Sequence, residues 1–260
     1  MNKKTYLQES LRQGKIMRWT CKMPLKVFIA PMQFYSKQGQ DSRYRAMVRK
    51  ALDSWQAATK GKVSFTIVND LMSSQINVTW KRVERKALGH CYFDYDKNNR
   101  LYSAEVSIGL TDGLIHRDYG DDGEVYHTIL HEIGHAVGLG HSPFPEDIMY
   151  TPHQKGILTV SYQDVLTLNW LYTFPQGATV KDITSKYQVS ATDIDEAIIK
   201  IMDKKSADVE TETKNIVKKP KRDLLEEQDS IANLRKYHLS IQNVKMSDEM
   251  RKFFSKPPNS

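Results

Sequence analysis

The strongest chemical pattern in the sequence is a short stretch rich in histidine. Residues 131–141 read His-Glu-Ile-Gly-His-Ala-Val-Gly-Leu-Gly-His. His131 and His135 are four residues apart, so on a helix their imidazoles project from one face, one turn apart, and can reach the same metal ion. Gly138 can end that helix with a positive φ, and the turn would bring His141 to the same ion. The pattern therefore predicts three imidazole ligands for one metal ion.

The residue after the first histidine would supply a base. Three imidazoles leave one position of a tetrahedral zinc ion open for water, which is typical of a catalytic site and not of a closed structural one. The metal lowers the pKa of that water to about 7, and a carboxylate beside it can accept the proton. We predict one catalytic Zn²⁺ held by His131, His135 and His141, with Glu132 as the general base.

A further histidine, His127, precedes the motif by one turn of the same predicted helix. Three ligands in line along a helix would span about 12 Å, which is too far for one ion at about 2.1 Å from each. We therefore interpret His127 as a packing or supporting residue. His153, which follows the motif, is interpreted as a surface or locally hydrogen-bonded side chain.

The elements that must position these residues follow from the period of the apolar side chains. Apolar residues at period two predict strands over residues 25–29, 63–68, 76–80, 88–93 and 104–108. Helical spacing predicts one helix from residue 42 to about 58 and another over 160–172, which opens on a capping-box pattern of Ser161 and Asp164. The order strand, helix, strand implies a right-handed crossover and a mixed sheet with a helix on one face.

Length and charge limit the class of protein. The chain has 260 residues, 40% of them hydrophobic, and a formal net charge of +7. Residues 1–30 contain seven Lys or Arg and one Glu, so they carry +6 and the remainder is nearly balanced, which argues against a nucleic-acid partner. No apolar run reaches the roughly 18 residues of a membrane span. The first residues lack an apolar core, and we expect no signal peptide.

The histidine motif and the residues after it resemble the metzincin zinc metallopeptidases, specifically the matrixin (matrix-metalloproteinase-like) branch. The resemblance rests on residues 131–141, Ser142, Pro145 and Ile148-Met149-Tyr150, and it extends over about residues 20–175. Met149 matches the Met-turn of that family, in which a methionine forms an apolar floor beneath the ligands. Astacin-like and serralysin-like relatives usually have tyrosine two residues later, where this chain has Thr151.

The resemblance implies an α+β fold of metzincin type. It has a mixed, mostly parallel, twisted five-stranded sheet, an active-site helix, a Met-turn and a closing helix. The family also implies an apolar pocket for the residue after the scissile bond, and an antiparallel edge strand that binds an extended substrate as an added strand. In this chain the strand would comprise Leu88, Gly89, His90, Cys91 and Tyr92.

Three regions are expected along the chain. Residues 1–18 would form a loose N-terminal arm, residues 19–175 the matrixin-like metallopeptidase domain, and residues 176–260 a charged, partly helical or disordered C-terminal extension. Charge runs with few large apolar residues favour a linker in that last region.

Calcium and disulfide chemistry stay open. Asp94, Asp96 and Asn98 have the spacing at which a calcium loop begins, but the glycine and glutamate that complete such a loop are missing. A second acidic group precedes the histidine helix, at Asp118, Asp121, Asp122 and Glu124. Cys21 lies outside the propeptide motif by which matrixins block their zinc, so we do not expect that form of latency. The sequence does not decide whether Cys21 and Cys91 pair.

Together these observations predict a monomeric zinc-dependent endopeptidase that hydrolyses internal bonds of proteins or peptides. The alternative is a catalytically idle zinc-containing protein that binds peptides or acts as an adaptor through its C-terminal extension, and the presence of Glu132 disfavours it. The family resemblance suggests an extracellular location, which the lack of a recognisable signal peptide does not support. The compartment is therefore left open.

Overall fold

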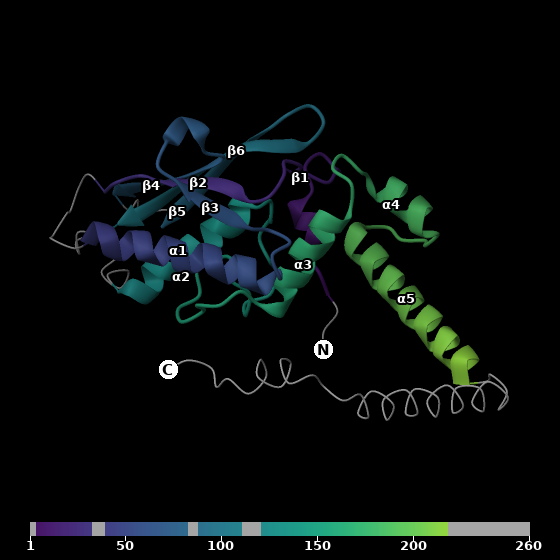
Figure 1. The fold of residues 1–260 in the computed structure, drawn as a ribbon. Helices are drawn as coiled ribbons and strands as arrows, with labels where there is room; N and C mark the ends of the chain where they lie inside the picture. The colour runs from purple at the N-terminus through teal and green to yellow at the C-terminus, as the bar shows by residue number, and fades with distance from the viewer. Residues whose placement is uncertain (1–3, 33–39, 83–87, 111–120, 218–260) are drawn as a thin grey trace, which may run out of the picture. The chain divides into compact units, whose positions relative to one another are not determined.

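The computed structural model describes residues 4–32, 40–82, 88–110 and 121–217 (Figure 1). In chain order the elements are η1 (Leu7–Ser10), β1 (Arg18–Trp19), β2 (Leu25–Ile29), α1 (Gln40–Ala58), β3 (Phe65–Val68), η2 (Leu71–Ser73), β4 (Ile76–Arg82), β5 (Gly89–Tyr95), β6 (Arg100–Leu110), α2 (Asp122–Ala136), α3 (Tyr162–Thr173), α4 (Val180–Tyr187) and α5 (Ile194–Val217). Asp118 and the part of the C-terminal extension from residue 218 onward lie outside the described residues.

A mixed and mainly parallel sheet forms the centre of the fold, as expected. Its strand order is β1-β6-β4-β2-β3, and β5 pairs antiparallel with β6. The other pairings are all parallel. Five strands were expected and the described residues form six, because Arg18–Trp19 adds a two-residue strand beside Arg100 and Leu101. Among the described residues, β5 pairs with no second strand and so lies at an edge.

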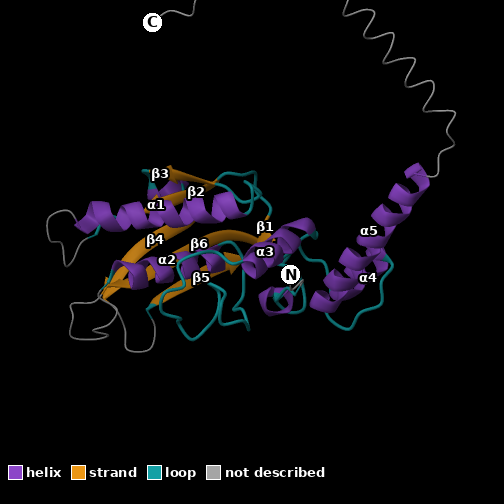
Figure 2. Ribbon diagram, turned by 90° about the horizontal axis from the view of Figure 1, so that it is seen from below, coloured by secondary structure: helices purple, strands orange, loops and turns teal. Residues whose placement is uncertain are grey.

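Two helices cover the same face of this sheet, as both views show (Figure 1 and Figure 2). The apolar stripe of α1 is buried, and it comprises Val48, Ala51, Leu52 and Trp55. The Trp55 indole Nε1 donates a hydrogen bond of 2.9 Å to the Leu130 carbonyl, which joins α1 to α2. The helical spacing of apolar residues in this segment is thus explained, because one side of α1 packs against the sheet and α2.

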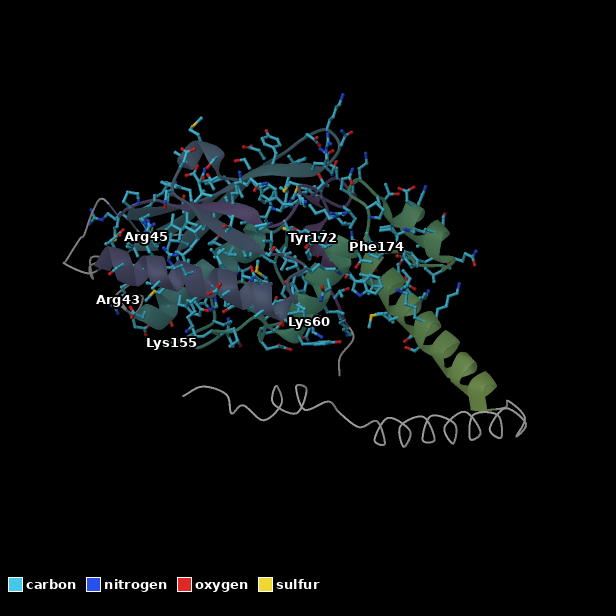
Figure 3. The ribbon with its side chains drawn as sticks, viewed as in Figure 1. Arg43, Arg45, Lys60, Lys155, Tyr172 and Phe174 are labelled. Carbon is cyan, nitrogen blue, oxygen red and sulfur yellow. The ribbon has the colours of Figure 1, made fainter. Side chains whose placement is uncertain are left out.

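The closing helix α3 begins with the predicted capping box. The Asp164 amide donates to Ser161 Oγ over 3.0 Å, and the Ser161 amide donates back to Asp164 Oδ2 over 2.9 Å. Near the C-terminal end of α3, Tyr172 donates from its hydroxyl to the Val137 carbonyl over 3.1 Å, and Phe174 is fully buried. Both side chains are labelled in Figure 3. This helix therefore packs directly on the segment that follows α2.

The N-terminal segment differs from the expected loose arm. Tyr6, Leu7, Ile16 and Met17 are at most 2% exposed and belong to the hydrophobic core. The Tyr6 hydroxyl donates a 2.6 Å hydrogen bond to Asp164 Oδ1. The physical reason is that two pairs of adjacent apolar residues interrupt an otherwise polar stretch, and burying them stabilises the segment against the fold.

The core also continues past residue 175, where we expected the metallopeptidase domain to end. Ile183 of α4 and Ile194, Ile198 and Ile201 of α5 are at most 2% exposed and belong to the same hydrophobic cluster. A first compact unit ends at Asp203, and a second begins at Lys204 within α5. Among the described helices, none is long and apolar enough to cross a bilayer.

Candidate metal centre

Helix α2 carries the first two histidines, and local interactions define where it begins and ends. Asp121 caps its start by accepting a 2.8 Å hydrogen bond from the Glu124 amide. Gly138 has a φ of +105°, as predicted, which is a backbone conformation that residues with a Cβ rarely adopt. The chain therefore turns back after α2, and His141 follows from that turn.

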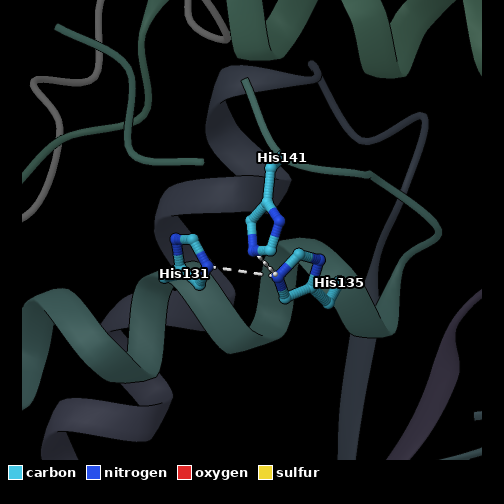
Figure 4. Close-up of side chains that lie close together, drawn as sticks. All are labelled: His131, His135 and His141. Atoms are coloured by element: carbon cyan, nitrogen blue, oxygen red, sulfur yellow. Dashed lines mark hydrogen bonds between the residues drawn. The ribbon is translucent and has the colours of Figure 1, made fainter. Parts of the chain in front are cut away.

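The three histidines converge in the structure as predicted. The Nε2 atoms of His131 and His135 are 3.1 Å apart, and those of His135 and His141 are 3.2 Å apart (Figure 4). Ligands at about 2.1 Å in a tetrahedron are about 3.4 Å from one another, so these spacings are close to those around a zinc ion. Within the described part of the chain, this is the group of His, Cys, Asp or Glu side chains that has the geometry to hold a metal ion.

Backbone carbonyls fix which nitrogen of each helix histidine can bind a metal. His131 donates from Nδ1 to the Ile148 carbonyl over 2.7 Å, and His135 donates from Nδ1 to the Leu139 carbonyl over 2.8 Å. With the proton on Nδ1, the lone pair of each Nε2 is free for a metal. Burial lowers the pKa of His131 to about 3 and that of His135 to about 4, so both imidazoles are neutral at pH 7, as ligands must be.

Glu132 lies in the same cleft and is 6% exposed. Burial raises the pKa of its carboxyl group to about 8. A bound cation beside it would favour the carboxylate and lower that pKa again. Strand β5 packs directly against this side chain, since a Cβ added to Gly89 would lie 2.9 Å from Glu132 Oε1.

A cleft of about 580 Å³ opens above the histidines. Four of the five predicted substrate-edge residues line it, namely Leu88, Gly89, His90 and Cys91. Tyr92 does not line it, and its ring, which stacks on His90, is 62% exposed. The cleft is thus bounded on one side by the edge of β5 that pairs with no strand of the described residues.

One end of the cleft carries polar side chains, among them His127 and His153. His153 Nε2 lies 2.5 Å from Glu124 Oε2, and the rings of His153 and His127 are 3.9 Å apart between centroids. His127 donates from Nδ1 to the Ile157 carbonyl over 2.7 Å and lies outside the metal-ligand group. The sequence already placed His127 one turn before His131, and the position of Glu124 one turn before His127 was the further signal that all three share one face of α2.

The N-terminal segment forms part of the site that sequence reasoning missed. Ser10 Oγ accepts a 2.8 Å hydrogen bond from the Gly140 amide, next to His141. A Cβ at Gly140 would overlap the Glu9 carbonyl, so the two segments are in backbone contact. Arg12 lines the cleft together with His135 and His141. The apolar residues on both sides of this stretch were the available signal that it is packed.

Several other predicted residues have protein partners. Asp96 accepts hydrogen bonds from the amides of Asn98 and Arg100 and pairs with the Arg100 side chain, and Asp122 pairs with Arg43. Cys21 and Cys91 are both free thiols. Met149 is fully buried beneath α2, and a Cβ at Gly134 would overlap its sulfur.

A mainly parallel sheet with an antiparallel edge strand, and a helix and turn that bring three histidines together beside it, define a metal-binding domain of the metzincin class. The sequence profile of the matrixin family matches residues 19–173, and the chain belongs to that family. It is also similar to the probable matrix metalloproteinase 095L of Invertebrate iridescent virus 3, at 35% identity over 71 residues. That similarity covers 27% of this chain and 20% of the viral protein's length.

Proposed function

We propose that this matrixin is a zinc-dependent endopeptidase. The observation that carries the proposal is the convergence of three imidazole Nε2 atoms beside a buried glutamate, in a cleft bounded by the edge of β5 that no described strand covers. His131, His135 and His141 would hold the ion. Their donor set fits zinc, because neutral imidazoles are among its preferred ligands and the fourth position stays open.

The chain's own residues would then carry out the proton transfers. Bound zinc supplies an acidified water and polarises the scissile carbonyl. Glu132 would accept a proton at its carboxylate and donate it to the leaving amine nitrogen, so that it is regenerated at the end of each cycle. The carbonyls of Ile148 and Leu139 hold the ligand rings in place through Nδ1 of His131 and His135. We assign Met149 the role of the apolar floor beneath the ligands.

The edge of β5 would bind the substrate. An extended peptide can pair with an exposed edge through main-chain hydrogen bonds, which gives affinity that depends little on its sequence. Leu88 to Cys91 lie along this edge next to Glu132, so a peptide bound there would place a carbonyl group over the metal centre. The substrates we expect are therefore unfolded or extended segments of proteins, bound by a monomer. Asp96 and Asp122 already have hydrogen-bond or ion-pair partners in the protein, so we propose no calcium ion as part of the site.

The test is cleavage of a peptide library by the zinc-loaded protein, with and without a chelator. Glu132→Gln should bind zinc like the parent and lose cleavage by about 10²–10⁴-fold, because the ligands remain and the base is removed. Glu146→Gln is the matched control, since Glu146 is exposed and does not line the cleft. Full cleavage by Glu132→Gln, or no cleavage by a zinc-loaded parent, would refute the proposal. Zinc binding is measured separately by competition with a chromogenic chelator.

A further inference from the structure

The proposed chemistry leaves one charged side chain of the cleft without a role. Arg12 lines the cleft and lies near His135 and His141. Its guanidinium carbon lies 5.2 Å from the centroid of the Phe93 ring, on β5. Arg12 therefore joins the N-terminal segment to the edge strand that we propose as the substrate-binding edge.

The backbone around Arg12 holds this side chain in place. Arg12 and Lys15 exchange two main-chain hydrogen bonds of 3.0 Å, and the residues between them, Gln13 and Gly14, have φ values of 51° and 73°. This is a two-residue hairpin whose central residues both have positive φ, as in a type I′ turn. The Asn99 side chain also donates to the Arg12 carbonyl over 3.3 Å. The guanidinium thus starts from a tightly defined backbone position.

The charge of Arg12 is not neutralised within the described part of the chain. In that part, no carboxylate lies within ion-pair distance of its guanidinium, and the polar contacts of the residue are made by its backbone. Glu9 also lies near His141, but its side chain is exposed and forms no ion pair with Arg12 among the described contacts. A guanidinium that stacks on an aromatic ring keeps its N–H edge free, and that edge matches a carboxylate in two parallel hydrogen bonds.

We infer that Arg12 is a specificity-determining residue that binds a carboxylate side chain, Asp or Glu, of the substrate on the His141 side of the scissile bond. This inference rests on the proposed peptidase function. The same chemistry would bind a free C-terminal carboxylate of a short peptide, so the two sources need separate arms in the test. A substrate Gln at the same position lacks the negative charge, so Arg12 would bind it much more weakly than Asp or Glu.

The test uses peptide pairs that differ by Glu against Gln at one position, scanned across the cleavage site. One set of peptides is amidated at the C-terminus, and a second set ends in a free carboxylate. For the position that faces Arg12, kcat/KM should favour Glu by about three- to tenfold, the range expected for a partly exposed charge-assisted pair. Arg12→Gln should reduce that ratio to about one, and Arg12→Lys should keep part of it. Raising NaCl from about 0.05 to about 0.5 M should weaken the preference, since salt screens an exposed pair.

Lys15→Gln is the matched control, because it removes the same charge from the same hairpin. Lys15 is exposed, lies outside the cleft and bridges to Thr179 through its backbone. It should leave the ratio unchanged, whereas an equal loss in Lys15→Gln would refute a local contact with Arg12. A second readout needs no turnover: the same peptide pairs, fluorescently labelled, are titrated against zinc-loaded Glu132→Gln, and the Kd should show the same preference.

The outcomes separate the two claims. A zinc-loaded parent that cleaves nothing refutes the peptidase function, while a Kd preference for Glu that disappears in the Glu132→Gln, Arg12→Gln double variant still supports the role of Arg12. Cleavage and binding without any preference for Glu, or a preference that Arg12→Gln leaves intact, refutes the role of Arg12. A preference found only with free C-terminal acids would refute a side-chain carboxylate and assign the contact to the peptide terminus.

Discussion

Replacing Ser10 with alanine is a direct test of whether the N-terminal segment is part of the metal centre. Ser10 is 1% exposed, and its Oγ accepts the hydrogen bond of the Gly140 amide over 2.8 Å. Alanine leaves that buried N–H without an acceptor, which costs about 1–3 kcal/mol of the free energy of unfolding. His141 follows Gly140 directly, so the loosened loop should also weaken zinc binding. We expect a loss of up to about tenfold, less than when a group bonded to a ligand is removed.

Two assays measure these effects. Equilibrium unfolding in urea, in the presence of a chelator, gives the change in stability without any contribution of the metal. Competition with a chromogenic chelator gives the zinc Kd of the folded protein. Ser73→Ala is the matched control, because Ser73 is exposed and its Oγ donates to the Asp70 carbonyl within the short helix η2, so its loss should change stability by less than about 0.5 kcal/mol. If Ser10→Ala behaves like Ser73→Ala in both assays, the N-terminal segment does not support the site.

Packing, burial and metal linkage give three other predictions. Gly134→Ala should lower the free energy of unfolding by about 1–3 kcal/mol, because the new Cβ overlaps the Met149 sulfur and lies 2.9 Å from Trp55 Cζ2; urea unfolding measures it. Burial raises the pKa of Asp147 to about 6, above the pKa of the same group in the unfolded chain. The protonated side chain therefore adds at most about 3 kcal/mol to the free energy of unfolding below about pH 4, and this contribution is lost as the pH rises through 6. Asp147→Asn should remove that decline when unfolding of the chelator-treated protein is followed from about pH 4 to 7. Zinc at about 100 times its Kd should raise the free energy of unfolding by about 2.7 kcal/mol in a thermal or urea titration, and His135→Ala should abolish the increase.

The parts of the fold that local sequence patterns encode were predictable. The period of the apolar residues placed α1 and the strands β2, β4 and β6 within a few residues, and the capping box of α3 was visible in Ser161 and Asp164. The spacing of His131, His135 and His141, with Gly138 at the turn, was sufficient to predict from the sequence alone that these three imidazoles converge. These features depend on residues close together in the chain.

The remaining parts depend on contacts between distant residues. Ser10 and Gly140 are 130 residues apart, and nothing near Ser10 indicates which backbone amide it accepts from. The two-residue strand β1 is too short to show a period. Arg12 is one of seven basic residues in the first 30, and only the hairpin and the packing of its neighbours place it in the cleft. Residues 1–18 are polar on average, and for that reason the few apolar side chains that pack this segment against the core were overlooked in the sequence.

The packing of the N-terminal segment also determines when the site is completed during synthesis. Its partners are made late, since the Tyr6 contact with Asp164 spans 158 residues and the Leu7 contact with Asp195 spans 188. At a translation rate of about 5–20 residues per second, the second partner is added roughly 10–40 s after Leu7. Contacts of such high sequence separation form slowly because a long loop must be closed first. The wall of the cleft that carries Arg12 is therefore translated well before its partners and is among the last parts of this domain to be assembled.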